Sequence, residues 1–262
     1  MQAVGKRISG YLLVAAVTVT AGCAAGTSSS DRANAIAPSL EASDVYTRYV
    51  EALGGREALQ RYSSSRGVGE FSMPMQGISG ELEVFGAAPN LMLVRVEITG
   101  IGTVRQGYDG EVGWSINPAT GSMVLEGMML DQLRQQADFL GPLGIEAYVD
   151  SARVVADTVF DERPCQKVRL VTKWGEEYFE YYDVESGLLA GTVRRQASPM
   201  GPMETTTVVS EYQDFGGILV PTMTVQETMG MEQVITVTAV EFDTVDPAVF
   251  TLPAEIAAMV GK

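Results

Sequence analysis

A run of carboxylates and aromatic rings between residues 176 and 183 is the part of the sequence that comes nearest to acid–base chemistry. Four acidic residues alternate there with four aromatic ones: Glu176, Glu177, Glu180 and Asp183 with Tyr178, Phe179, Tyr181 and Tyr182. A glycosidase would need two carboxylates that face each other across a cleft. We expect this run to be the solvated side of a β-strand instead, with Asp183 in a turn, a position that Asp favours.

Other common catalytic and cofactor-binding arrangements are missing from the sequence. The chain has no histidine, which excludes Ser-His-Asp and Cys-His catalysis and HExxH zinc sites. Gly100, Gly102 and Gly107 lack the spacing of a dinucleotide-binding loop and lead into a strand pattern rather than a helix. We therefore predict a protein that is not an enzyme and has no cofactor and no metal site. An enzyme that uses carboxylates, Lys or Ser is the lowest-ranked alternative.

Three expected turns each carry two methionines. The pairs are Met73 with Met75, Met200 with Met203, and Met229 with Met231. Loop tips are normally polar because they lie at the surface, whereas methionine is flexible and suits surfaces that accept varied apolar partners. Two interpretations stay open: an apolar rim at a cavity mouth or on a lipid surface, and turns that fold inward to fill the core.

The pattern between Arg66 and Phe242 is that of β-strands joined by short turns. We count about eleven strands, and the hairpin turns between them indicate an antiparallel meander with one apolar face. The predicted fold class is mainly β (α+β): a single curved antiparallel sheet or half-open β-barrel with helices as a lid. The clearest alternation gives five candidates for the lining of its cavity: Met92, Val94, Val96, Ile235 and Val237.

Three segments have helical periodicity, at about 45–53, 56–62 and 128–140. A one-sided sheet must cover its apolar face, and helices this short cover only part of it. A hollow therefore stays open. Each methylene of an acyl chain buried in it would contribute about 0.8 kcal/mol.

The first 23 residues resemble a bacterial lipoprotein signal. Lys6 and Arg7 precede a short apolar run, and small residues stand directly before Cys23, although Thr20 occupies a position where Leu is usual. A run this short cannot span a bilayer as a helix. We predict a signal peptide at 1–22, a lipidated Cys23 (palmitate or similar chains) with a flexible tether at 23–38, and one domain at 39–262. Ordinary cleavage near Ala25, which would give a soluble periplasmic protein, is the alternative.

Charge and cysteine content narrow the partners further. The formal net charge is −15, which argues against nucleic acid as a partner because the phosphate backbone would be repelled. If Cys23 is lipidated, Cys165 has no partner within the chain. We predict that Cys165 is a buried small hydrophobe and that the protein has no disulfide.

Five groups of residues together resemble a known bacterial superfamily. They span Tyr49–Leu59 with its Gly54-Gly55 stop, Tyr108–Gly121, Tyr181–Leu189, Ser210–Pro221 and Phe250–Pro253. These turns and helix stops are similar to those of LolA/LolB-like proteins, above all the outer membrane lipoprotein-sorting relatives. The resemblance implies a half-open antiparallel barrel whose helical lid covers an apolar concavity that accepts acyl chains. It supplies no ligand-contacting residue for this chain.

The sequence thus predicts an envelope lipoprotein that binds a lipid, or the acyl chains of another lipoprotein, without catalysis. Ala24 after the cysteine favours the outer membrane in the lipoproteins that the chain resembles, with the domain facing the periplasm. The alternative is a structural or interaction module that docks an envelope protein complex and has no lipid ligand.

Overall fold

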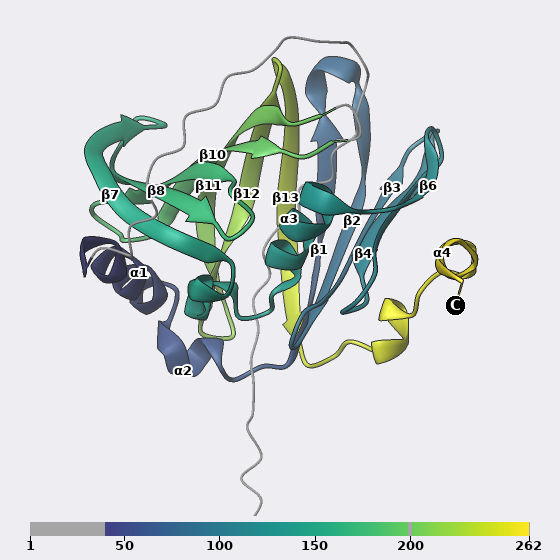
Figure 1. The fold of residues 1–262 in the computed structure, drawn as a ribbon, viewed down its shortest axis with the longest axis horizontal. Helices are drawn as coiled ribbons and strands as arrows, with labels where there is room; N and C mark the ends of the chain where they lie inside the picture. The colour runs from purple at the N-terminus through teal and green to yellow at the C-terminus, as the bar shows by residue number, and fades with distance from the viewer. Residues whose placement is uncertain (1–39, 199–200, 262) are drawn as a thin grey trace, which may run out of the picture.

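The computed structural model describes residues 40–198 and 201–261 (Figure 1). The predicted signal peptide at 1–22, the tether at 23–38 with Cys23, and Met200 lie outside the described residues. Among the described residues, no helix has the length and apolar character needed to cross a bilayer.

One antiparallel sheet of thirteen strands forms the body of the molecule, in the order β6-β5-β4-β3-β2-β1-β13-β12-β11-β10-β9-β8-β7. The strands are β1 (Ser64–Met73), β2 (Ile78–Ala87), β3 (Leu91–Ile98), β4 (Gly102–Tyr108), β5 (Gly113–Asn117), β6 (Gly121–Val124), β7 (Val149–Phe160), β8 (Arg163–Thr172), β9 (Glu177–Asp183), β10 (Leu189–Gln196), β11 (Met203–Phe215), β12 (Ile218–Thr228) and β13 (Met231–Phe242). The predicted fold class is confirmed. The predicted count of about eleven is slightly low, and strands as short as the four residues of β6 leave little alternation to detect.

The helices are short. They are α1 (Leu40–Ala52), α2 (Gly55–Leu59), α3 (Gly127–Ala137) and α4 (Ala254–Val260), with 3-10 turns η1 (Pro74–Gln76), η2 (Gly141–Leu143), η3 (Ile145–Ala147) and η4 (Pro247–Phe250). α1 begins five residues before the predicted 45–53. Helix α4 was not predicted, because its seven residues give only two turns of helical periodicity. Between α1 and α2 the predicted stop is present, with Gly54 and Gly55 at φ +124° and +81°.

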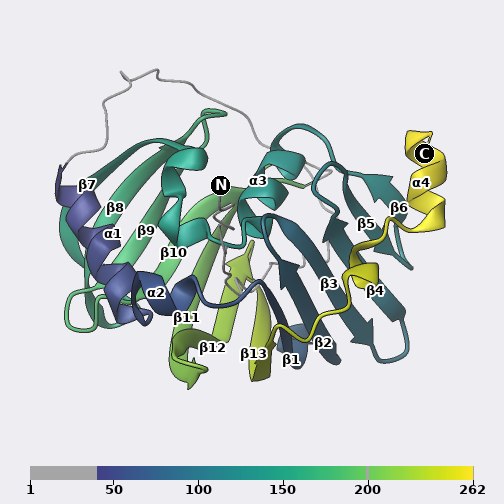
Figure 2. The same cartoon turned by 90° about the horizontal axis from the view of Figure 1, so that it is seen from below.

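The segment from Leu125 to Tyr148 must cross the concave face of the sheet. It leaves β6 at one edge and enters β7 at the other edge, so it connects the two ends of the curved sheet. Figures 1 and 2 show α3 on this crossing, inside the hollow, with α1 against the β7–β9 flank and α4 outside the opposite flank. α2 lies near the turn between β11 and β12, where Gly54 closely approaches Gly217.

Two separate clusters fill the concave side. The first, here called the α3 core, packs Leu133 and Ala137 of α3 against the aliphatic residues of β1–β4 and β13. The second, the α1 core, packs α1 and α2 against β7–β9 and β12, with Tyr178 and Tyr182 at its centre. On the outer face η4 and α4 place Phe250 and Ile256 against Phe85, Leu93 and Trp114, so β2, β3 and β5 are covered on both sides.

Candidate functional site

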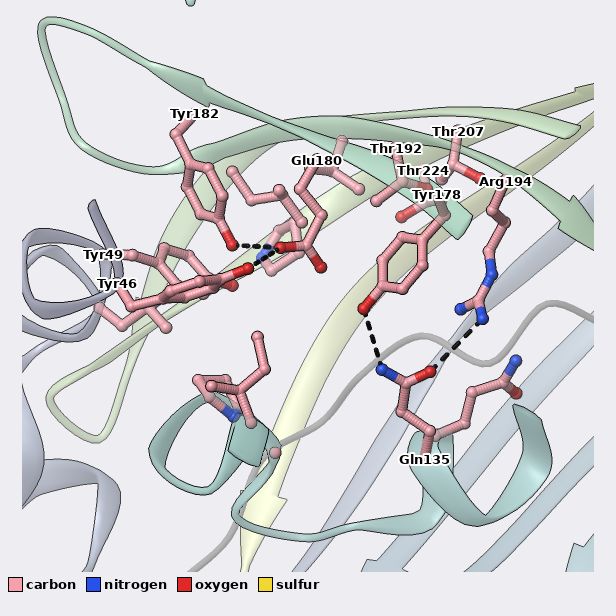
Figure 3. A pocket seen from close by; sticks show the side chains of 18 of the residues that line it. Tyr46, Tyr49, Gln135, Tyr178, Glu180, Tyr182, Thr192, Arg194, Thr207 and Thr224 are labelled. Carbon is pink, nitrogen blue, oxygen red and sulfur yellow. Dashed lines mark hydrogen bonds between the residues drawn. The ribbon is translucent and has the colours of Figure 1, made fainter. Parts of the chain in front are cut away.

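A cavity of about 210 Å³ lies on the concave side beside the α1 core. Strands β9–β12 form its floor, α1 forms one wall, and the C-terminal end of α3 with η2 and η3 forms another (Figure 3). Its lining combines apolar groups, such as Leu53, Ile145 and Val220, with an unusual number of tyrosines. Six of the ten tyrosines of the chain line it: Tyr46, Tyr49, Tyr148, Tyr178, Tyr182 and Tyr212.

Glu180 is the central polar group of the α1 side of the cavity. Its Oε2 accepts hydrogen bonds from the hydroxyls of Tyr46 and Tyr182, both at 2.7 Å. Desolvation raises the pKa of Glu180 above its usual range, although the two hydroxyl donors and Arg194 oppose this shift. The Tyr182 ring also packs edge-on against the rings of Tyr46 and Tyr49, with centroids 5.6 and 5.2 Å apart. These contacts fix α1 to β9.

A second polar cluster fixes α3 to β9 and β10. Arg194 donates to both carboxylate oxygens of the buried Glu176, at 3.1 and 2.9 Å. Its guanidinium also lies 4.7 Å from the centre of the Tyr178 ring. From α3, the Gln135 amide donates to the Tyr178 hydroxyl at 3.1 Å, and the Gln132 amide donates to Glu176 at 2.9 Å. α3 is therefore held across the hollow by side-chain hydrogen bonds as well as by its apolar face.

Asp138 and Tyr148 contribute a third polar contact at the cavity, next to η2 and η3. Burial raises the pKa of Asp138, and a hydrogen bond from Tyr148 and one from the Leu140 backbone act against that rise. Desolvation and the nearby Asp138 raise the pKa of Tyr148 to about 12. Both groups hold their protons more tightly than usual.

The prediction that the acidic run is a solvated strand face was wrong for two of its four members. Glu176 is 5% exposed and Glu180 lines the cavity, because alternation along β9 turns Tyr178, Glu180 and Tyr182 inward. Glu177 is exposed as expected. Asp183 is a turn residue, as predicted: its Oδ1 accepts from the backbone N–H groups of Glu185 and Ser186.

The five residues predicted to line the cavity lie elsewhere on the concave side. Met92, Val94, Val96, Ile235 and Val237 all belong to the α3 core and are at most 4% exposed. None is among the residues that line the cavity described above. Long aliphatic alternation therefore identified the part of the sheet that the protein fills with its own side chains.

The methionine turns meet at one end of the sheet. Pairing brings them side by side, since Ser72 lies opposite Val234, Thr228 opposite Met231, and Gln196 opposite Met203. Within them Met73 is 2% exposed, whereas Met75 and Met229 are 76% and 67% exposed. Met203 and Met231 are partly buried. Neither of the two proposed roles thus applies to all of these residues.

Cys165 is fully buried and is not in a disulfide, and burial raises the pKa of its thiol. No group of three or more His, Cys, Asp and Glu residues within the described part of the chain could hold a metal ion.

No protein-family model and no curated protein sequence matches the chain. Several solved structures match its fold. A DUF1329 family protein from Desulfovibrio piger superposes with a TM-score of 0.57 at 12% identity, over 80% of this chain and 96% of the other. A LolA superfamily protein from Nitrosomonas europaea gives 0.54 at 12% identity, over 80% and 97%. An outer membrane lipoprotein-sorting protein domain from Vibrio parahaemolyticus gives 0.53 at 10% identity, over 80% and 97%.

The fold is LolA/LolB-like. The resemblance suggested by the helix stops and turns of the sequence is confirmed at this level. In this LolA/LolB-like fold the cavity residues come mainly from α1, the C-terminal end of α3 and β9–β12. None of them was predicted from the sequence to contact a ligand. The signal that could have found them is the spacing of tyrosines at 46, 49, 178 and 182, since buried tyrosines need hydrogen-bond partners.

Proposed function

We propose that this protein binds a hydrophobic ligand, a lipid or the acyl chains of another lipoprotein, in the cavity between α1, α3 and β9–β12, and that it does so without catalysis. The observation that carries the proposal is the cavity itself, in a sheet whose other half is filled. Its apolar lining favours an acyl chain by about 0.8 kcal/mol for each buried methylene.

The size of the cavity suits a single chain. Pockets for drug-sized ligands are about 300–1,000 Å³, and this cavity has about 210 Å³. Most of its lining atoms are carbon, and the cavity is partly open to solvent. One acyl chain can enter from that side.

The hydrogen bonds of Glu176 and Glu180 support binding rather than acid–base chemistry. Glu176 is held by Arg194 and Gln132, and Glu180 is held by two tyrosines. Each carboxylate thus serves to position a neighbouring element.

Mass spectrometry of co-purified lipid tests the proposal. A form that begins at Asp31 lacks Cys23 and keeps every residue that the structure describes. We expect it to retain an acyl lipid in a ratio that approaches one per chain, and Leu219→Trp, which places a large ring in the cavity, to lose it. A lipid-free protein that also takes up no added lipid would rule out the function.

We further propose that Cys23 is lipidated and holds the domain on the outer membrane, facing the periplasm. The support is the lipobox-like sequence and the fold shared with a lipoprotein-sorting domain. Cys23→Ala should move the protein from the membrane fraction to the soluble periplasmic fraction. An unchanged distribution would contradict the anchor.

The exposed Met75 and Met229 favour a second candidate, a module that docks an envelope protein. Both side chains lie on neighbouring turns of the same sheet end. This alternative predicts no bound lipid in the extract. It also predicts that cross-linking in cells joins the protein to one envelope partner, and that the double variant Met75→Glu with Met229→Glu loses that partner.

A further inference from the structure

A row of polar side chains crosses the floor of the cavity. Strand pairing places Glu180 opposite Thr192, Thr192 opposite Thr207, and Thr207 opposite Gln226. All four line the cavity, and Figure 3 shows Thr192, Thr207 and Thr224 close together beside Tyr178. A site for a bare alkyl chain has no need of such a row, because each polar group would lose water on binding without gaining a partner.

Two polar atoms at the cavity lack a partner. Thr224 is 3% exposed and its Oγ1 makes no hydrogen bond. Across the cavity, the buried Oε1 of Gln136 on α3 is also unpaired. Leaving buried polar atoms unpaired costs free energy, so these positions suit a ligand that supplies the missing bonds. The Thr224 hydroxyl can donate or accept, whereas Gln136 Oε1 can only accept.

The charges around the cavity disfavour an anionic ligand. Of the described residues that line it, Arg194 is the one cation, and its guanidinium is already bound to Glu176. Glu180 and Asp138 are the acidic lining residues. A carboxylate or phosphate here would stand beside Glu180 without a free cation, or would force Glu180 to take up a proton.

We infer that the cavity selects amphiphiles whose head group is uncharged and both donates and accepts hydrogen bonds, such as acyl glycerols or acyl amides, over free fatty-acid anions. The inference rests on the proposed function and specifies its ligand class. The acyl chain would lie against Leu53, Ile145 and Val220, and the head group against Thr224 and Gln136.

Three probes with the same sixteen-carbon chain test the inference: palmitate, monopalmitoylglycerol and palmitamide. Binding of each to the delipidated form that begins at Asp31 is measured by calorimetry at pH 7.5. We expect the two neutral probes to bind about tenfold more tightly than palmitate, which corresponds to 1.4 kcal/mol. Glu180→Gln should narrow the gap by strengthening palmitate binding.

Thr224→Val separates recognition from folding. It keeps the shape of the side chain and removes the unpaired hydroxyl, so we expect it to weaken binding of the neutral probes about three- to tenfold. Palmitate binding and thermal stability should not fall. The matched control is Thr206→Val, because Thr206 adjoins Thr207 on β11 and alternation turns it to the other face of the sheet.

The outcomes distinguish the head-group inference from the proposed acyl-binding function. If palmitate binds as tightly as the neutral probes, or if Thr224→Val leaves the neutral probes unaffected, the head-group inference is overturned while the acyl-binding function stands. If none of the three probes binds, both are overturned.

Discussion

Where α3 covers β1–β4, aliphatic side chains fill the concave face, whereas beside α1 the strands β9–β12 carry tyrosines and polar groups and leave a cavity. Alkyl side chains in the α3 core can interdigitate until little space is left. The rings of Tyr46 and Tyr182 cannot move inward in this way, because their hydroxyls are both held by Glu180. The hydrogen-bonded hydroxyls of these tyrosines therefore keep this half of the concave face from closing on itself.

The largest expected effect is the loss of a large side chain from the filled half. Leu133 on α3 is 1% exposed within the α3 core, so Leu133→Ala should lower the free energy of unfolding by about 3–5 kcal/mol. Leu219, at the cavity wall and only partly buried, is the matched position in the other half. Leu219→Ala should cost about 1–2 kcal/mol. Urea denaturation measures both free energies, and equal losses in the two variants would contradict the difference between the two halves.

Substitutions that add a methyl group should also distinguish the filled half from the cavity, with a smaller effect on the free energy of unfolding. A Cβ on Gly113 would lie 2.7 Å from Leu130 and 2.9 Å from Leu133 in the α3 core, whereas one on Gly141 at the cavity would meet nothing within 4 Å. Gly113→Ala should therefore destabilise the fold by about 1–3 kcal/mol. Gly141→Ala should change stability by less than about 0.5 kcal/mol. A costly Gly141→Ala, measured by the same denaturation, would mean that the cavity is tighter than described.

Much of the fold could be predicted from the sequence because its signals are local. Alternation along β3 and β13 and the Gly54-Gly55 stop depend on neighbouring residues, and these gave the meander and the boundary between α1 and α2. The place of the cavity is not local. It depends on which face of β9 turns inward and on which strands α3 crosses, and these follow from pairing between residues far apart, such as Tyr46 and Glu180.

The acidic run at 176–183 also shows that local alternation does not determine which side chains are buried. Aromatic and acidic residues alternate imperfectly between 176 and 183, so the sequence allows either face to be the buried one. The structure turns Tyr178, Glu180 and Tyr182 to the same side of the sheet: both tyrosines are buried, whereas Glu180 is half-buried and its pKa is raised. The tyrosine donors from α1 and β9 and the charge of Arg194 oppose that rise, and the sequence of β9 alone does not reveal the donor from α1.

A third prediction concerns the half-buried carboxylate of Glu180 in the polar half of the concave face. Because the pKa of Glu180 is raised, the folded chain binds its proton more tightly than the unfolded chain does. The resulting stability is fully present below about pH 4.5, the usual pKa of Glu, and is lost as the pH rises through the pKa of the folded state. Glu180→Gln should therefore gain stability relative to the natural protein as the pH rises above 4.5.

The groups that face Glu180 do not reverse this sign. Tyr46 and Tyr49 on α1, Tyr178 and Tyr182 on β9 and Arg194 on β10 are present in both proteins. Asp183 and Asp243, whose pKa values are lowered, act in the opposite direction and cancel in the difference. Unfolding free energies of the two proteins across the pH range provide the measurement. A difference that does not change with pH would show that Glu180 is not desolvated.

The smallest expected effect belongs to the methionine turns, at the end of the sheet where the filled half meets β11 and β12. Met75 and Met229 are largely exposed, so replacing either with Ser should change the unfolding free energy by less than about 0.5 kcal/mol. Met73, two residues before Met75 and 2% exposed, is the control: Met73→Ala should lower the free energy of unfolding by about 2–5 kcal/mol.

Since neither Met75 nor Met229 lines the cavity, replacing either with Ser should also leave the binding of monopalmitoylglycerol unchanged. A stability loss at Met75 or Met229 would mean that these tips fold back onto the protein, whereas a loss of ligand binding alone would make them part of the entrance to the cavity.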